Sequence, residues 1–191
     1  MVVCDGMTKL TRSFLTMIWL ELVFVSPVLA QMSALEESTL KAVFVERFTR
    51  FIDWPATVLE DASSNHFVIC SLGRNEFSAT LSKVYANKTI LGHPVLVISD
   101  AKLDTIERCH ALYLSADVRG KVGEVLDRVE GMPILTIGDT QGYAHQGVLI
   151  NFFNVNEKLR FEINEKSMRN AGFDVSYKLL SYAVVVESDA E

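Results

Sequence analysis

The residues of this sequence that could carry out chemistry fall into three small groups. Ser38 and Lys41 have the S-x-x-K spacing of serine hydrolases in which a lysine assists the nucleophile. Cys109 and His110 are adjacent and have the residue types of a thiol nucleophile and its base. Asp139 lies in the glycine-rich stretch "TIGDTQGYAHQG". The residues around each group decide whether it serves chemistry or structure.

The first two groups lack the partners that catalysis requires. Hydrolases of the S-x-x-K type also carry motifs such as S-D-N and K-T-G, and neither of these occurs here. We therefore interpret Ser38 and Lys41 as part of a solvent-facing helix surface. Adjacent residues near the start of a strand point to opposite faces, so Cys109 and His110 are poorly placed to share a proton.

The usual signatures of metal and nucleotide sites are also missing from the sequence. Neither H-E-x-x-H nor C-x-x-C occurs, and there is no glycine-rich nucleotide fingerprint. The four histidines lie far apart in the sequence, at positions 66, 93, 110 and 145. We predict a protein that is not an enzyme and that has no metal site and no cofactor.

Asp139 is the strongest remaining acidic candidate. It follows the end of a predicted strand, where open α/β sheets bind ligands, and three nearby glycines would let a ligand approach the backbone. The simpler interpretation is a loop in which the aspartate completes a turn. Trp54 ends an aromatic helix face and is the residue of that face that we expect to be partly exposed. A ligand held near residues 138–147 and Trp54 is an alternative to a purely structural role.

The stretch "LRFEIN", residues 159–164, alternates apolar and polar side chains. In an extended strand its leucine, phenylalanine and isoleucine point to one face, and its arginine, glutamate and asparagine point to the other. The apolar face fits a protein core. The polar face fits a catalytic site, a solvated sheet face or a surface that another protein reads, and alternation alone leaves these three open.

Composition narrows the class of protein. The chain has 191 residues, of which 49% are hydrophobic and 22% are charged, and this composition indicates one globular domain. The net charge of -6 argues against a general nucleic-acid binder, which normally carries a basic surface.

The first thirty residues have the pattern of a secretory signal. Lys9 and Arg12 precede the apolar run "SFLTMIWLELVFV", and the small or apolar residues "SPVLA" follow. We expect residues 1–30 to be a cleaved signal peptide and residues 31–191 to be the exported domain. The alternative is a membrane anchor, but Glu21 interrupts an apolar stretch that is already shorter than the ~20 residues of a membrane span.

Two cysteines remain after such a cleavage, Cys70 and Cys109. In an exported protein two cysteines are most simply a disulfide, and these two are 39 positions apart. Closing a loop of this size stabilises a fold by roughly 3–4 kcal/mol in the chain-entropy model. The alternative is two separate buried thiols.

The hydrophobic pattern predicts an α/β domain. A capping box at Ser33 and Glu36 opens a helix that ends near Trp54-Pro55. Short apolar runs, which are typical of strands, then alternate with segments whose apolar residues recur at helical spacing. The expected strands are 67–73, 93–99, 111–114, 133–139, 148–155 and 158–164. The expected helices are 77–85, 103–109, 122–129, 166–171 and 176–186. The fold class is a single α/β domain with a mixed, mostly parallel sheet flanked by helices, and with an antiparallel hairpin near the C-terminus.

Five segments together carry a family resemblance. They are "LKAVFVERFTRFIDWP", "FVICSLG", "RCHALYLS", "ILTIGDTQGYAHQGVLINFF" and "LRFEINEKSMRNAGFDVSYKLLSYA". In this order they resemble the YfiR family of periplasmic regulators (YfiR/HmsC-like), from about Leu40 to Ala183. The resemblance covers nearly all of the expected exported domain.

The resemblance implies a function in signalling. Such a protein is periplasmic and often a homodimer, and it represses an inner-membrane diguanylate cyclase by binding the periplasmic domain of that cyclase. Its release, for instance by an outer-membrane lipoprotein, would raise cyclic di-GMP and favour biofilm formation. A periplasmic small-molecule-binding module is the alternative function.

The resemblance also assigns roles to residues. It implies a disulfide between Cys70 and Cys109, in agreement with the export argument. The surface that controls the cyclase would include Glu162, with neighbouring contacts at Ile150 and Met168.

One departure from the family pattern affects the glycine-rich loop. Some members have a second cysteine pair flanking this loop, where the present chain has Ala144 and Asn151. The loop is therefore expected to lack a covalent tether, which argues against redox control through it.

Overall fold

The computed structural model describes residues 26–59 and 65–188. The chain divides after Glu37, and the residues from Ser38 onward form one compact unit. Most of the expected signal peptide lies outside the described residues, so its cleavage stays a prediction. Within the described part of the chain, no helix is both long enough and apolar enough to cross a membrane.

The first helix, α2, runs from Ser26 to Phe51. The predicted start at Ser33 is therefore wrong. Ser26-Pro27 supplies an earlier start, because proline is favoured in the first turn of a helix, where its missing N–H costs nothing. The helix ends before Trp54-Pro55, as predicted, and residues Ile52–Asp53 form the short strand β1.

Eight strands of the described chain form one mixed sheet in the order β10-β8-β7-β6-β5-β2-β4-β3. Strands β4, β2, β5, β6 and β7 are parallel to one another. Strand β3 is antiparallel to β4, β8 is antiparallel to β7, and β10 is parallel to β8. The strands of this sheet are β2 (Phe67–Leu72), β3 (Thr89–Ile90), β4 (His93–Ala101), β5 (Ala111–Leu114), β6 (Leu135–Gly138), β7 (Ile150–Val155), β8 (Lys158–Asn164) and β10 (Val184–Val186). A separate pair joins β1 to β9 (Asp174–Val175). The predicted fold class is confirmed.

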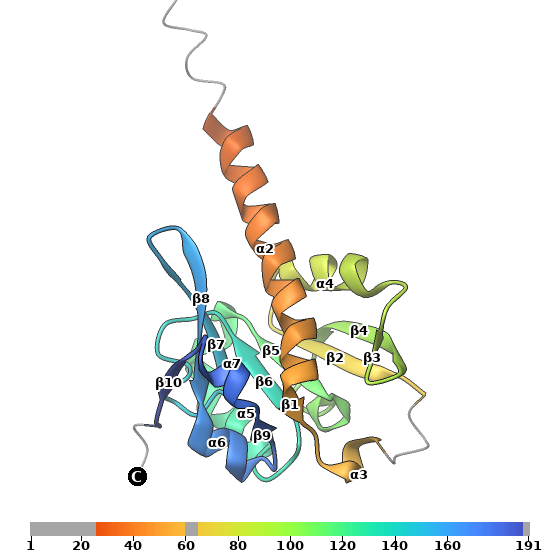
Figure 1. Ribbon diagram of the computed structural model, residues 1–191. Coiled ribbons are helices and arrows are strands. Elements are labelled where there is room, and N and C mark those ends of the chain that lie inside the picture. Colours follow the sequence, from red (N-terminus) through yellow and green to blue (C-terminus); the bar gives the residue numbers. More distant parts are fainter. Residues whose placement is uncertain (1–25, 60–64, 189–191) are drawn as a thin grey trace, which may run out of the picture. The chain divides into compact units, whose positions relative to one another are not determined.

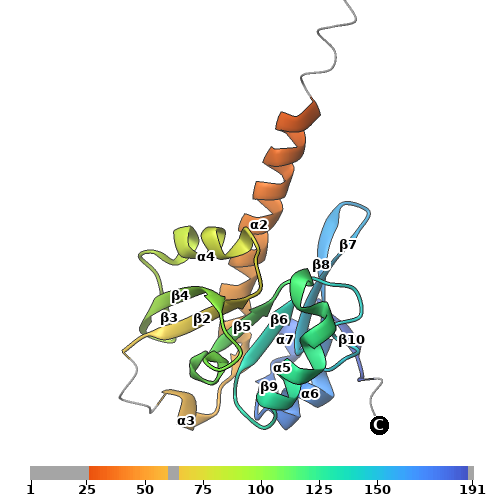
Figure 2. The ribbon, with the colours of Figure 1, turned by 180° about the vertical axis from the view of Figure 1, so that it is seen from behind.

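Helices cover both faces of the sheet (Figures 1 and 2). The remaining helices are α3 (Ala56–Leu59), α4 (Phe77–Tyr85), α5 (Val122–Arg128), α6 (Glu165–Asn170) and α7 (Tyr177–Leu180), with 3₁₀ turns η1 (Ile106–Arg108) and η2 (Ala116–Lys121). One core cluster packs α2, from residue 38 on, and α4 against one face, and a second cluster packs η2 and α5 against the other. Apolar side chains of the same strands therefore alternate between two cores.

Two helix predictions are corrected by the structure. The segment 103–109 forms only the single turn η1. The closing helix predicted over 176–186 is wrong, because only α7 is helical and Val184–Val186 form strand β10. Three consecutive β-branched valines favour an extended strand, and pairing with β8 satisfies their backbone groups.

The β7–β8 hairpin is confirmed and extends past its neighbours. Its turn is Asn156-Glu157, and both residues have positive φ, at 48° and 60°, as a type I′ turn requires. Of the residues in β7, only Ile150 and Asn151 pair with β6. Most of the hairpin is therefore paired only between its own two strands. We call residues 152–161 the hairpin arm (Figure 1).

Candidate functional site

A row of four residues crosses the sheet at Glu162. Glu162 is in register with Asn151 on one side and Val184 on the other, and Asn151 is in register with Gly138. Register partners on adjacent strands point to the same face. Glu162 therefore lies on the face that α5 covers further along the sheet, opposite the apolar side chains of its own strand, as the alternation of "LRFEIN" predicts.

Glu162 is half-buried and is held by an amide. Nδ2 of Asn151 donates a hydrogen bond of 3.0 Å to Oε2 of Glu162. Asn151 is itself buried, and its Oδ1 accepts no hydrogen bond within the described residues. No cation pairs with Glu162 in that part of the chain, so neighbouring Arg160 does not neutralise the carboxylate.

Asn164, the third polar residue of "LRFEIN", has a structural role. Its side chain is buried and caps α6, because Oδ1 accepts a hydrogen bond of 2.9 Å from the backbone N–H of Ser167. Nδ2 donates to the carbonyl of Ala144 at 2.8 Å and to Oγ of Ser188 at 2.7 Å. Asn164 thus joins three segments of the chain and offers no surface to a partner.

The other two expected contact residues are also buried. Ile150 lies opposite Ile163 inside the first core cluster, and Met168 on α6 packs in the same cluster. Neither side chain has exposed surface. A direct contact with a partner would require this part of the molecule to rearrange, whereas Glu162 is accessible in the structure as it stands.

The glycine-rich loop, residues 138–147, is packed on the sheet. Tyr143 is buried, and its hydroxyl donates a 2.9 Å hydrogen bond to the carbonyl of Ser115. Burial raises the pKa of the Tyr143 phenol. A Cβ at Gly138 would stand 2.6 Å from Cδ2 of Tyr143, so only glycine fits beneath this ring. The loop is thus held without the second cysteine pair, by Tyr143 and by the bond from Asn164 to Ala144.

Asp139 pairs with Lys41, which is 98 positions away in the sequence. Nζ of Lys41 lies 2.8 Å from Oδ2 of Asp139, and the two side chains are only 13% and 24% exposed. The interpretation of Lys41 as part of a solvent-facing helix surface is therefore wrong. The pair links α2 to the end of β6, which is an adequate structural reason for both charges.

Trp54 packs against two aromatic rings. Its ring meets Phe67 and Phe173 edge-on, at centroid distances of 5.4 and 4.9 Å. Its Nε1 donates to the carbonyl of Thr49 at 3.1 Å. Trp54 follows the end of α2, whereas the Lys41 that holds Asp139 lies ten residues before that end, about 15 Å along the axis. The structure therefore does not bring Asp139 and Trp54 together in one site.

The cysteines form the predicted disulfide. Cys70 on β2 is bonded to Cys109, with a Cα–Cα distance of 5.8 Å. His110 stacks on Phe67, and its Nδ1 accepts a 2.9 Å hydrogen bond from the N–H of Val68. The adjacent cysteine and histidine are thus both structural. No group of three or more His, Cys, Asp or Glu residues in the described chain could hold a metal ion.

Sequence reasoning missed a group of exposed apolar residues near the C-terminus. Tyr177 is 86% exposed, Tyr182 66%, Val184 50% and Val185 47%. They make up four of the ten large hydrophobic residues exposed in the described chain. All four residues lie in the segment 176–186, which was wrongly predicted to be a closing helix. Their exposure as a group was therefore not expected. We call these four residues the C-terminal apolar group.

The fold and the site define a mixed α/β domain whose polar strand residues form internal hydrogen bonds. Comparison with protein families matches residues 38–184 to the YfiR/HmsC-like family, and the chain belongs to this family. Membership suggests a periplasmic regulator of cyclic di-GMP signalling, in a family that is regulatory and non-catalytic. Among curated proteins no match is found.

Solved structures give only weak likenesses. One is the ABC domain in complex with L-Trp from Streptococcus pneumonia, with 12% identity and a TM-score of 0.46 over 62% of this chain and 55% of that one. Another is a conserved domain protein from Vibrio cholerae O1 biovar El Tor, with 10% identity and a TM-score of 0.45 over 68% of this chain and 57% of that one. The chain spans little more than half of each structure, and likenesses this weak carry no argument about function.

Proposed function

We propose that this protein is a periplasmic regulator that represses an inner-membrane diguanylate cyclase by binding the periplasmic domain of the cyclase. Family membership supports a regulatory role. The observation that carries the proposal is the position of Glu162, a half-buried carboxylate in register with the exposed Val184 at the outermost strand of the sheet. A charge bordered by exposed apolar residues is a common composition for a protein-binding surface.

The proposed mechanism is a population shift. A regulator that binds one state of a sensor domain more tightly than another holds the sensor in that state. Valines on an edge strand contribute apolar area, and the Glu162 carboxylate contributes specificity, because a partner must present a donor or a cation to it. Release of the regulator returns the cyclase to its active state and raises cyclic di-GMP.

The test is a charge reversal with a matched control. Glu162→Lys places a cation on the proposed surface, whereas Glu157→Lys makes the same change in the exposed hairpin turn. Both variants are exported in cells that contain the cyclase, and cellular cyclic di-GMP is measured. We expect Glu162→Lys to lose repression and Glu157→Lys to retain it. Circular dichroism of the purified proteins establishes that both are folded, and continued repression by folded Glu162→Lys would refute the proposal.

Two assembly partners belong to the same proposal. A homodimer is expected, and light scattering of the purified protein measures it directly. An outer-membrane lipoprotein that relieves repression would compete for the regulator. Co-purification with wild-type protein, compared with Glu162→Lys, tells whether it uses the same surface as the cyclase.

A further inference from the structure

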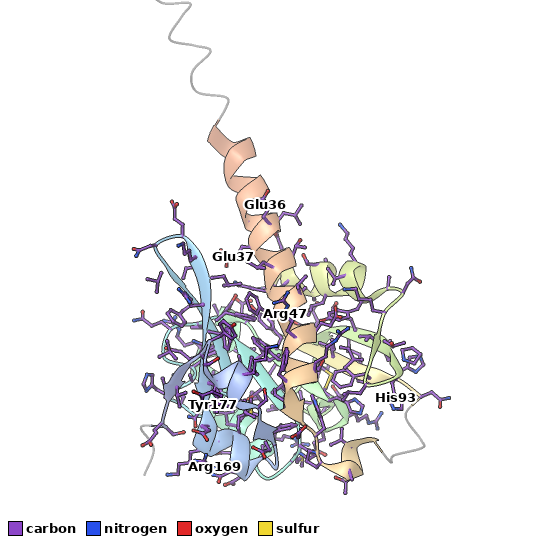
Figure 3. All side chains as sticks on the ribbon, viewed as in Figure 1. Glu36, Glu37, Arg47, His93, Arg169 and Tyr177 are labelled. Carbon is purple, nitrogen blue, oxygen red and sulfur yellow. A yellow bond between two sulfur atoms is a disulfide. The ribbon has the colours of Figure 1, made fainter. Side chains whose placement is uncertain are left out.

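A cavity of about 500 Å³, whose lining includes neither Glu162 nor Val184, has a volume in the range typical of small-molecule sites. It is bounded by α2, the β8 side of the hairpin arm and the segment around α7. Its ten lining residues are Phe44, Arg47, Arg50, Phe51, Leu159, Arg160, Phe161, Lys178, Leu179 and Tyr182. We call it the basic cavity. Figure 3 labels Arg47 on α2.

The charge of the basic cavity is opposite to that of the whole chain. Four of its ten lining residues are cations and none is a carboxylate, although the chain has a net charge of -6. Two other cavities have mixed charges, since one contains Asp127 and Glu130 beside Lys166, and the other contains Glu107 beside Arg108. Four cations gathered at one cavity from three separate segments form a localised positive potential.

Most of this charge has no counter-ion in the protein. Arg50 pairs with Glu46 at 2.7 Å. No ion pair in the described residues engages Arg47, Arg160 or Lys178, and Nζ of Lys178 lies 5.3 Å from the centre of the Phe51 ring. Unpaired cations that line one cavity without a carboxylate repel one another, and a bound anion would relieve that repulsion.

The remaining lining residues are apolar or aromatic. Phe161 and Leu179 are buried, and Phe44 and Phe51 are half-buried against the first core cluster. Tyr182 is exposed at the rim. An inorganic anion would leave these surfaces in water, whereas a ligand with an apolar body would cover them. The cavity thus combines an anion-binding rim with an apolar floor.

We propose that the basic cavity binds a small organic anion with an apolar, ring-sized body, such as an aromatic carboxylate or sulfonate. Arg47 and Lys178 bind the acidic group, and the phenylalanine and leucine side chains cover the apolar body. This site is distinct from the alternative ligand position near Asp139 and Trp54, because neither of these residues lines the basic cavity. The inference does not rest on repression of a cyclase.

Two dyes of nearly identical shape separate the charge requirement from the apolar one. The probe is 8-anilinonaphthalene-1-sulfonate, and N-phenyl-1-naphthylamine has the same ring system without the sulfonate. Fluorescence titration of the full chain is expected to give saturable binding of one sulfonate dye per chain. The neutral dye is expected to bind at least about tenfold more weakly, because it makes no charge-assisted hydrogen bond.

The variants test the location of the site. Arg47→Gln with Lys178→Gln removes two cations from the basic cavity, and Arg74→Gln with Lys83→Gln removes two exposed cations elsewhere. We expect the first double variant to weaken binding of the sulfonate dye about tenfold or more. The control double variant and Glu162→Lys are expected to bind as wild type does.

Because the substituted side chains are exposed, both double variants are expected to keep the wild-type melting temperature. If the first double variant loses its fold, the single Lys178→Gln variant serves in its place. Equal sulfonate affinity of a cavity variant and the control, or equal affinity of the two dyes for wild type, would overturn the proposal.

Discussion

The two flanks of the sheet are built differently. On the flank formed by β2 and β5, every strand residue is buried, and the Cys70–Cys109 disulfide ties β2 to the residues just before β5. On the flank formed by β7, β8 and β10, buried and exposed residues are mixed, and three asparagines and a glutamate lie within the strands. We call these the disulfide flank and the hairpin flank.

We infer from this difference that the disulfide flank serves mainly stability and that the hairpin flank carries the proposed recognition surface. The disulfide flank has helices or turns on both faces, so its residues are constrained mainly by packing. The hairpin flank ends in a short edge strand with exposed valines, and its polar side chains must find hydrogen bonds or solvent. The surface that we propose to receive a partner therefore lies on the hairpin flank, and removing constraints from either flank should have different consequences.

The largest expected effect comes from the disulfide flank. Replacing both Cys70 and Cys109 with serine removes the cross-link, and we expect the free energy of unfolding to fall by about 3–4 kcal/mol. Urea denaturation under oxidising conditions measures this loss. Reduced wild-type protein is the matched comparison and should show a similar loss. Equal stability of the oxidised wild type and the double variant would remove the distinction between the flanks.

On the hairpin flank the largest effect should come from Asn164. Asn164→Ala removes the cap of α6 and leaves the carbonyl of Ala144 without its donor, so a loss of about 2–3 kcal/mol is expected. Urea denaturation measures it. Asn170→Ala, at the exposed end of α6, is the control and should change stability by less than about 0.5 kcal/mol. A mild effect at Asn164 would mean that the loop is held mainly by Tyr143.

The ion pair between Lys41 and Asp139 should have an intermediate effect. Lys41→Met leaves a largely buried carboxylate without its cation, and we expect a loss of about 1–2 kcal/mol. Combining it with Asp139→Asn in a double-mutant cycle measures the coupling between the two residues. Additive losses would mean that each side chain acts through other contacts, and the link from α2 to β6 would lose its support.

The smallest effect on stability is expected at Glu162. In Glu162→Gln the new side-chain carbonyl still accepts the hydrogen bond from Asn151, so stability should change by less than about 0.5 kcal/mol. Thermal denaturation measures this change. A loss of more than about 1 kcal/mol would assign the carboxylate a structural role and would weaken its interpretation as a recognition residue.

Much of the fold could be predicted from the sequence, because local patterns determine it. Short apolar runs predicted the parallel strands, and Asn156-Glu157 predicted the hairpin turn. The disulfide was predicted from the cysteine count of a chain that we expect to be exported. The failures lie where two local signals compete. Ser26-Pro27 begins the helix earlier than the capping box, and the valines of 184–186 continue a helical spacing but pair as a strand.

The candidate site was less predictable, because side-chain exposure depends on the assembled fold. The alternation of apolar and polar residues predicted on which face of the sheet Glu162 lies. Only the packing of the folded chain shows that Ile150 and Met168 have no exposed surface. The pairing of Lys41 with Asp139 spans 98 positions, and no local pattern encodes it. The basic cavity likewise draws its cations from α2, β8 and α7, which meet only after folding.

Strand β10 also affects how the sheet opens. It has three residues, it is the outermost strand, and two of its valines are about half exposed. Local opening of so short an edge exposes little apolar area and costs much less than global unfolding. Hydrogen exchange of the β8 amides that bond to β10 should therefore be faster than exchange in β2. During each opening, Glu162 lies on the edge of the sheet, where a strand from another chain can pair with β8.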